Sequence, residues 1–311
     1  ITGSSYPNMK ISIAGDGTYK ETIDLFCAEI GKTAVYKSTT EEWLNYQFLP
    51  AGKGLSLNKA ELFENLLRQK YCILVYEESP NNLVFYNQDT FKHNQLIAHA
   101  WSPELGLFCT ISQSGNYRVM TSPDGITFES HVAAEANTWS SICWSPELLL
   151  FCAVASDGAN RVMTSPDGTN WTAHPAAEAN AWVSVCWSPA LGKFCAVSLA
   201  GANRVMTSPD GTNWTSIAAA QANIWRSVTW SPALSLFCAV SQNGANRVMT
   251  SPTGAVWTSQ VHAENCTWYS VCWSPELLLF CAVAQTGGNR VQTSPNGVDW
   301  TAHAAAEDCA W

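Results

Sequence analysis

Side chains that can bind a ligand return at one fixed spacing through most of the chain. Tryptophan, arginine, asparagine and glutamate series each recur every 43 residues. Planar aromatic surface beside guanidinium, amide and carboxylate groups can stack on a sugar ring and hydrogen-bond its hydroxyls. The predicted carbohydrate- or receptor-binding residues are Trp139, Trp182, Trp225, Trp268, Arg118, Arg161, Arg204, Arg247, Arg290, Asn160, Asn203, Asn246, Asn289, Glu135 and Glu178.

The same regular spacing also fits a purely structural role. In that alternative each arginine pairs with a nearby carboxylate and each tryptophan belongs to the core. A repeated structural motif repeats its side chains as faithfully as a repeated binding site does. The residues alone leave both interpretations open.

A second tryptophan series marks the repeat. The tripeptide WSP occurs five times at intervals of 43 residues, beginning at Trp101, Trp144, Trp187, Trp230 and Trp273. Five copies cover residues 97–311. A fixed period of about 40 to 50 residues is typical of solenoids, arrays and propellers, and the local pattern decides among them.

One copy contains the pattern of four short strands. Apolar, β-favouring runs at 139–145, 150–156, 160–165 and 171–174 are separated by turn or loop segments. In the last turn, Pro166 suits the second turn position and Gly168 the position that needs a positive φ. The sequence therefore predicts an all-β propeller of five four-stranded blades, each packing both faces on its neighbours.

The repeat resembles known propeller motifs. TSPDGTNWT (164–172) is similar to a one-residue-shorter Asp-box of sialidase-like propellers, and WSPELxLFCAVA with NRVMTSPDGxxWT resembles repeats of phage- and virus-encoded propeller proteins. The last two copies depart, with Thr253 and Asn296 where the others have Asp124, Asp167 and Asp210. In the Asp-box family the motif is a fold-stabilising hairpin remote from the active site, so the resemblance implies a fold. The architecture also resembles the tachylectin type of five-bladed lectin.

The segment before the repeats differs in composition. Residues 1–95 hold nine of the sixteen basic residues. Strands are predicted at 10–14 and 33–38, helices at 20–30 and 58–70, and a hairpin at 72–88. These elements predict a small α+β domain that anchors the chain. Its hairpin resembles the middle of a blade, which leaves open a degenerate sixth blade.

A catalytic centre is not expected. A sialidase-type site needs an arginine cluster, a tyrosine nucleophile with an acidic partner and a separate acid, all at one place. Identical arginines on every blade give fivefold equivalence, which favours multivalent binding. The sequence therefore predicts a protein that is not an enzyme.

The twelve cysteines predict neither a metal site nor a cofactor. They lack the CxxC spacing of zinc sites. A hairpin around SPEL places Cys143 opposite Cys152, and the same holds for the third and fifth copies. Because Ala100 and Thr229 take the first-strand position in the other two copies, a small buried residue is the expected role, with reduced thiols.

Charge and hydropathy exclude several classes of protein. The net charge is -9, with only 13% charged and 47% hydrophobic residues, which argues against a nucleic-acid partner and against a disordered chain. The longest apolar run, 148–155, is too short for a membrane span. The chain begins at Ile1 without a signal-like sequence, so we expect either a processed protein or part of a longer product.

These observations predict a non-enzymatic binding or structural protein. The leading interpretation is a phage or viral particle component at the virion surface or outside the cell. Residues 1–95 would then attach to other virion proteins, and residues 96–311 would bind a glycan or a host surface receptor. The alternatives are a free tachylectin-type lectin, a decoration protein without a ligand and, least favoured, a sialidase-like glycosidase.

Overall fold

The computed structural model describes residues 96–307 in full and the backbone of five short strands within residues 1–95. The chain divides into two compact units, residues 1–93 and 94–311. The predicted helix at 20–30 lies outside the described residues, as do residues 59–70 of the second predicted helix and Trp311; Asn58, the predicted start of that second helix, is instead the last residue of a strand.

The strands of the first unit form two small sheets. β1 (Lys10–Ile13) pairs antiparallel with β3 (Leu55–Asn58). β5 (Asn82–Asn87) lies between β2 (Thr33–Tyr36), which is parallel to it, and β4 (Ile73–Ser79), which is antiparallel. The predicted hairpin thus belongs to a mixed sheet.

Residues 96–307 form five four-stranded antiparallel sheets in which the strands are ordered as in the sequence. This arrangement confirms the predicted propeller blades. The strands are β6 (Leu96–Ser102), β7 (Leu107–Ser112), β8 (Val119–Ser122), β9 (Glu129–His131); β10 (Trp139–Ser145), β11 (Leu150–Ala155), β12 (Val162–Ser165), β13 (Thr172–His174); β14 (Trp182–Ser188), β15 (Lys193–Ser198), β16 (Val205–Ser208), β17 (Thr215–Ile217); β18 (Trp225–Ser231), β19 (Leu236–Ser241), β20 (Val248–Ser251), β21 (Thr258–Gln260); β22 (Trp268–Ser274), β23 (Leu279–Ala284), β24 (Val291–Ser294) and β25 (Thr301–His303).

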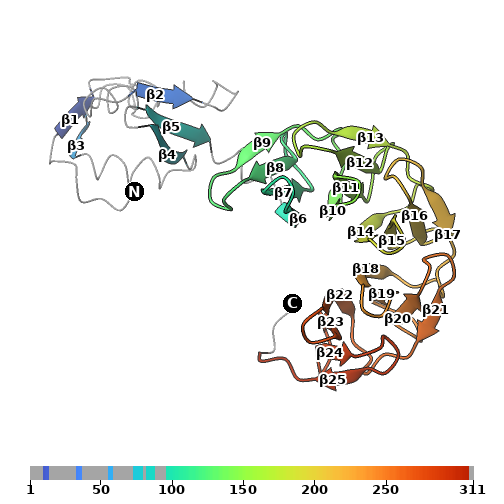
Figure 1. The fold of residues 1–311 in the computed structure, drawn as a ribbon. Coiled ribbons are helices and arrows are strands. Elements are labelled where there is room, and N and C mark those ends of the chain that lie inside the picture. The colour runs from blue at the N-terminus through green and yellow to red at the C-terminus, as the bar shows by residue number, and fades with distance from the viewer. Residues whose placement is uncertain are drawn as a thin grey trace. The chain divides into compact units, whose positions relative to one another are not determined.

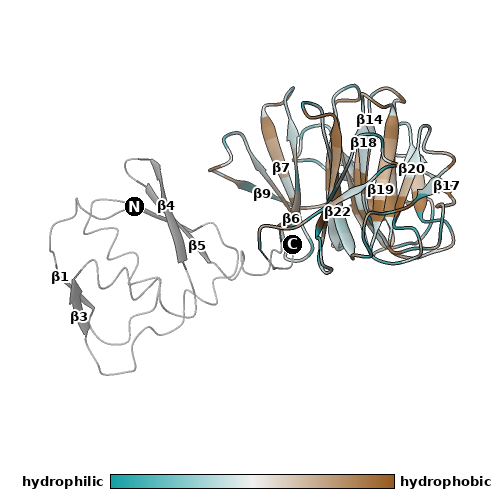
Figure 2. Ribbon diagram, turned by 90° about the horizontal axis from the view of Figure 1, so that it is seen from below, coloured by the Kyte–Doolittle hydropathy of each residue, from teal (hydrophilic) through white to brown (hydrophobic). Residues whose placement is uncertain are grey.

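The blades follow one another around an open arc, with the first strand of each blade on the inside (Figure 1). Up-and-down connections place the SPEL-like and SPDG-like turns at one end of every blade, which we call the turn face. The loops between the second and third strands and between blades lie at the opposite end, the loop face. Figure 2 shows brown, hydrophobic strands such as β7 within the blades and the teal, hydrophilic outer strand β9.

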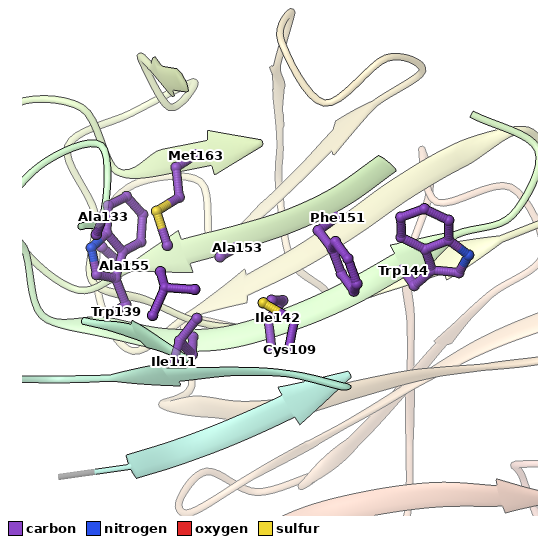
Figure 3. Close-up of a cluster of buried hydrophobic side chains, with 11 residues drawn as sticks. Cys109, Ile111, Ala133, Trp139, Ile142, Trp144, Phe151, Ala153, Ala155 and Met163 are labelled. Atoms are coloured by element: carbon purple, nitrogen blue, oxygen red, sulfur yellow. The ribbon is translucent and has the colours of Figure 1, made fainter. Parts of the chain in front are cut away.

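Hydrophobic side chains fill the joint between consecutive blades. Between the first and second blades, Cys109 and Ile111 of β7 meet Trp139, Trp144 and Phe151 of the second blade, and all five are buried (Figure 3). Equivalent clusters fill the next three joints. Two-sided burial explains why the second strand of each blade is continuously apolar.

The SPDG-like turns also contact the preceding blade. Gly168 has φ 76°, as its place in the turn predicts. A Cβ at this glycine would lie 3.1 Å from Thr121 and 3.2 Å from Leu107, both in the first blade. The turns of the second to fifth blades therefore each add a close contact at the turn face of a joint.

Candidate functional site

The repeated arginines bind backbone carbonyl groups. Arg161 donates from Nε to Gly158 O (3.1 Å) and from Nη1 to Ser156 O (3.1 Å) within its own blade. The same Nη1 reaches Asn180 O (2.8 Å) in the loop that leads to the third blade. Arg118, Arg204 and Arg247 make the corresponding contact with the following loop. Arg118, Arg161, Arg204 and Arg247 thus link consecutive blades at the loop face through backbone carbonyl groups.

The repeated glutamates and asparagines complete these links. Glu135, in the loop between the first two blades, accepts hydrogen bonds from Asn160 N (3.2 Å) and Asn160 Nδ2 (2.6 Å). Glu178 holds Asn203 in the same way, and Glu264 holds Asn289. Each carboxylate therefore ties an interblade loop to the blade that follows.

These hydrogen bonds stabilise the ionised carboxylates. The amide of Asn160 lowers the pKa of Glu135, and the amide of Asn203 lowers that of Glu178. Gln221 replaces the glutamate before the fourth blade, and its contact with Asn246 N is longer, at 3.4 Å. The neutral acceptor thus makes a weaker version of the same link.

The tryptophans predicted to stack on a sugar are buried. Trp139, Trp182, Trp225 and Trp268 have no exposed surface. The first three donate Nε1 to the backbone carbonyl four residues earlier, at 3.0 Å. This corrects the sequence-based assignment, because an indole enclosed between two blades cannot stack on a ligand. These four tryptophans lie in the joints, and the Arg, Glu and Asn hydrogen bonds described above link blades and loops at the loop face of those joints.

The Asp-box-like turns have the hairpin role that their resemblance implies. Asp167 Oδ1 accepts hydrogen bonds from Thr169 N and Asn170 N, both at 2.8 Å. Trp171 donates its Nε1 to Gly168 O at 2.9 Å and so covers the turn. In the fifth blade, Asn296 Oδ1 accepts the same pair of backbone bonds.

The cysteines are free thiols in the described residues. Cys143 lies opposite Cys152, as predicted, and Cys186 lies opposite Cys195. Burial raises the pKa of the Cys152 and Cys195 thiols far above the usual value, so these groups stay protonated and act as small apolar residues. Cys272, on the face of the fifth blade that is turned away from the fourth blade, is exposed.

One position inside the arc changes in every blade. The second residue of each first strand is Ile97, Ser140, Val183, Arg226 or Tyr269. In all five blades this residue interrupts the pairing register of the first two strands. Such β-bulges re-aim side chains and occur often beside functional sites. We call the inner edge of the loop face around these five residues the rim.

Arg226 and Tyr269 meet at the rim between the fourth and fifth blades. The Arg226 guanidinium carbon lies 4.9 Å from the centre of the Tyr269 ring, a cation–π distance. Arg226 Nη2 donates to Gln242 Oε1 at 3.0 Å. Arg226 Nε is buried and has no hydrogen-bond partner, whereas Tyr269 is 41% exposed.

Sequence reasoning missed this pair because it followed the residues that repeat. The available signal was the opposite one, a first-strand position that changes chemistry in every copy of an otherwise similar repeat. Within residues 96–307 no three His, Cys, Asp or Glu side chains are placed to hold a metal ion. No helix of the described residues is long and apolar enough to cross a membrane.

Comparisons with known proteins give the fold. No protein-family model and no curated protein matches the chain. Among solved structures, it is similar to a streptogramin B lyase, with TM-score 0.61 and 8% identity over 70% of each chain. A catalytically inactive virginiamycin B lyase from Staphylococcus aureus with quinupristin also has TM-score 0.61 and 8% identity, over 97% of this chain and 89% of that one.

Binding proteins and a further enzyme are also similar in structure. A nidogen/laminin complex has TM-score 0.52 and 14% identity over 68% of this chain and 81% of that chain. YCF48 bound to D1 peptide has TM-score 0.51 and 12% identity over 75% of each chain. For a GH74 enzyme from Niastella koreensis the values are 0.54 and 16%, over 67% of this chain and 38% of that one. The chain is therefore a β-propeller repeat protein by fold.

Proposed function

We propose that the chain is a non-catalytic binding protein whose ligand contacts the rim. One observation carries this proposal. The repeated side chains pack and hydrogen-bond between blades, whereas the residue at the bulge position of the rim differs in every blade. A constant scaffold with a varied edge, at which Ile97 and Tyr269 are exposed, suits recognition of a ligand. The binding proteins among the similar structures are consistent with such a role and do not identify the ligand.

The finer expectations from the sequence belong to the same proposal. The proposal includes a glycan or host surface receptor as the ligand. It also includes other virion proteins as partners of residues 1–95, and a location at the virion surface or outside the cell. Because the repeated tryptophans are buried, the proposal assigns the ligand contacts to the rim instead of to those tryptophans. It leaves the class of ligand open to test.

The experiment is an unbiased binding screen with the intact protein. The purified chain is applied to glycan and peptide arrays and compared with a variant whose rim is made uniform, with Ser140, Arg226 and Tyr269 each changed to the valine found at 183. We expect at least one class of ligand to bind the native rim and to be lost from the uniform rim. Absence of ligand on both arrays would refute the binding proposal.

A further inference from the structure

Arg226 differs from the repeated arginines of the propeller in what its guanidinium contacts. The repeated arginines donate to backbone carbonyls on both sides of a joint, as Arg161 does to Gly158, Ser156 and Asn180. Arg226 donates to one side-chain oxygen, that of Gln242. The Arg226 guanidinium therefore has N–H donors left for a ligand, whereas the corresponding donors of the repeated arginines bind backbone carbonyls.

The position of Arg226 directs this capacity toward the rim. Arg226 is the extra residue of the bulge between Trp225 and Ser227, so its side chain leaves the alternation that would otherwise bury it in a joint. Gln242 is itself held by a backbone bond from its N to Ile224 O at 3.0 Å. Tyr269 covers the guanidinium from the next blade at 4.9 Å. Two blades thus fix one cation at the loop face.

The electrostatic setting favours an anion at this place. The bulge residues of the other four blades are Ile97, Ser140, Val183 and Tyr269, so Arg226 is the one charged residue at this position of the repeat. A buried Nε without a partner is costly and calls for an explanation. A bound acceptor that engages the terminal nitrogens would offset part of that cost through charge-assisted hydrogen bonds.

We propose that Arg226, Gln242 and Tyr269 form a site for a carboxylate-bearing ligand at the rim. This inference rests on the proposed binding function and names the chemistry of its ligand. A carboxylate matches because it is planar, carries one charge and can accept two parallel N–H bonds from a guanidinium. The exposed part of the tyrosine ring supplies an apolar contact for the group that bears the carboxylate.

The carboxylate can come from an acidic peptide or from an acidic sugar, and two probes separate these sources. Fluorescein-labelled hexaglutamate is titrated against hexaglutamine, and sialyllactose is titrated against lactose. Inorganic phosphate serves as a competitor. We expect one of the two carboxylate probes to bind and its neutral counterpart to fail. Phosphate should compete only weakly, because a phosphate site normally draws on more donors than one shared guanidinium.

The repeat provides variants that keep the fold. Arg226→Val and Tyr269→Ser introduce the residues that occupy the same bulge in the third and second blades. Each should weaken binding of the carboxylate probe, Arg226→Val by about 10- to 100-fold, the size of a lost charge-assisted bond. Lys193→Leu removes the same charge at the turn face, where the other four blades have leucine, and should leave binding unchanged.

A gain of function provides an independent test. The triple change Ser140→Arg, Ser156→Gln and Val183→Tyr transfers the three side chains to the equivalent positions of the second and third blades. We expect the stoichiometry of carboxylate binding to rise from one site to two. Loss in Arg226→Val together with this gain would establish the site.

Distinct outcomes separate this inference from the function on which it rests. Array ligands that are neutral and bind Arg226→Val as well as the native protein would refute the carboxylate site and leave the binding function standing. Failure of both carboxylate probes, or phosphate competing as well as glutamate, would overturn the ligand chemistry. Equal weakening by Lys193→Leu would reduce the effect to net charge and overturn the site.

Discussion

Nearly the same residues lie in the joints between blades and on the two end faces, which are the faces of the first and fifth blades that no described blade covers. In the WSP series, Trp144, Trp187 and Trp230 lie in interior joints and are 9%, 8% and 7% exposed. Trp101, on the face of the first blade that is turned away from the second blade, is 43% exposed. At the other end, Cys272 is exposed although Cys143 and Cys186 at the same position are partly buried.

This difference shows that the burial of a side chain depends on whether a neighbouring blade covers it and is not fixed by its position in the repeat. Each blade offers one face with Trp, Phe and Met and another with Cys and Val, and the two faces bury each other only across a joint. Within the described residues, the outer faces of the first and fifth blades lack that neighbour. A substitution should therefore have effects that depend on where in the arc the blade lies.

Removing an indole should give the largest contrast. Trp187→Ala opens a cavity in an interior joint, and the free energy of unfolding should fall by about 3–5 kcal/mol. Trp101→Ala removes the same side chain from an end face and should cost only about 1 kcal/mol. Urea unfolding followed by tryptophan fluorescence measures both. Equal losses would show that the end face is covered in solution.

The loop face of a joint is expected to be nearly as sensitive. Gly201 has φ 121°, and a Cβ there would overlap the Asn180 side chain. Gly201→Ala should therefore cost more than about 2 kcal/mol, through both backbone strain and displacement of a partly buried amide.

Gly192 in the same blade supplies the matched control. It also has a positive φ, 57°, but a Cβ there would meet no atom within 4 Å. Gly192→Ala should cost about 1 kcal/mol, the strain alone. If the two alanine variants unfold at the same urea concentration, the close approach at Asn180 contributes nothing to the joint.

Much of the fold was predictable from the sequence because it depends on local patterns. The run at 139–145 became β10 with the same bounds, and Gly168 has the positive φ that its turn requires. Period and turn chemistry act over a few residues, so one sequence suffices to detect them. The binding residues were harder. Trp139 contacts residues of another blade, and no local pattern distinguishes an exposed indole from one enclosed by the preceding sheet.

Arg118 illustrates the same limit for charged residues. The sequence left open whether it binds a ligand or pairs with a carboxylate, but its guanidinium binds carbonyl oxygens of Gly115 and Gln113 and of the following loop. Backbone acceptors have no sequence signature, so residue types alone could not identify them. The rim was accessible in principle, since residue 226 departs from its repeat, but the bulge that re-aims it appears only in the strand register.

One hydrogen bond in the joints can be added or removed with a smaller effect. Glu147 Oε2 accepts from Trp187 Nε1 at 2.5 Å across a joint. At the next joint Ala190 takes the glutamate position, and Trp230 Nε1 is buried without a partner. Ala190→Glu should therefore stabilise the protein by about 1 kcal/mol, and Glu147→Ala should destabilise it by a similar amount.

The same residue at the end face provides the contrast. Glu276 occupies the equivalent position on the fifth blade and is exposed. Glu276→Ala should leave the free energy of unfolding within about 0.5 kcal/mol of the native value. A large loss in this variant would mean that the outer face of the fifth blade binds another blade-like surface.

The smallest predicted effect is on the pH dependence of the unfolding free energy, which should differ between the SPDG turns and the SPNG turn of the fifth blade. Burial raises the pKa of Asp210, but hydrogen bonds from Asn213 and Thr212 outweigh it and lower the pKa to about 2, from a usual value of 3.8. Because the folded pKa is the lower one, the stabilisation is complete above about pH 4 and is lost as the pH falls toward 2. Asn296 makes the same backbone bonds in the fifth blade without a charge. Asp210→Asn should therefore flatten the unfolding free energy between pH 4 and 2, and Asn296→Asp should steepen it. If both variants follow the native pH profile, ionisation of these turns does not contribute to the joints.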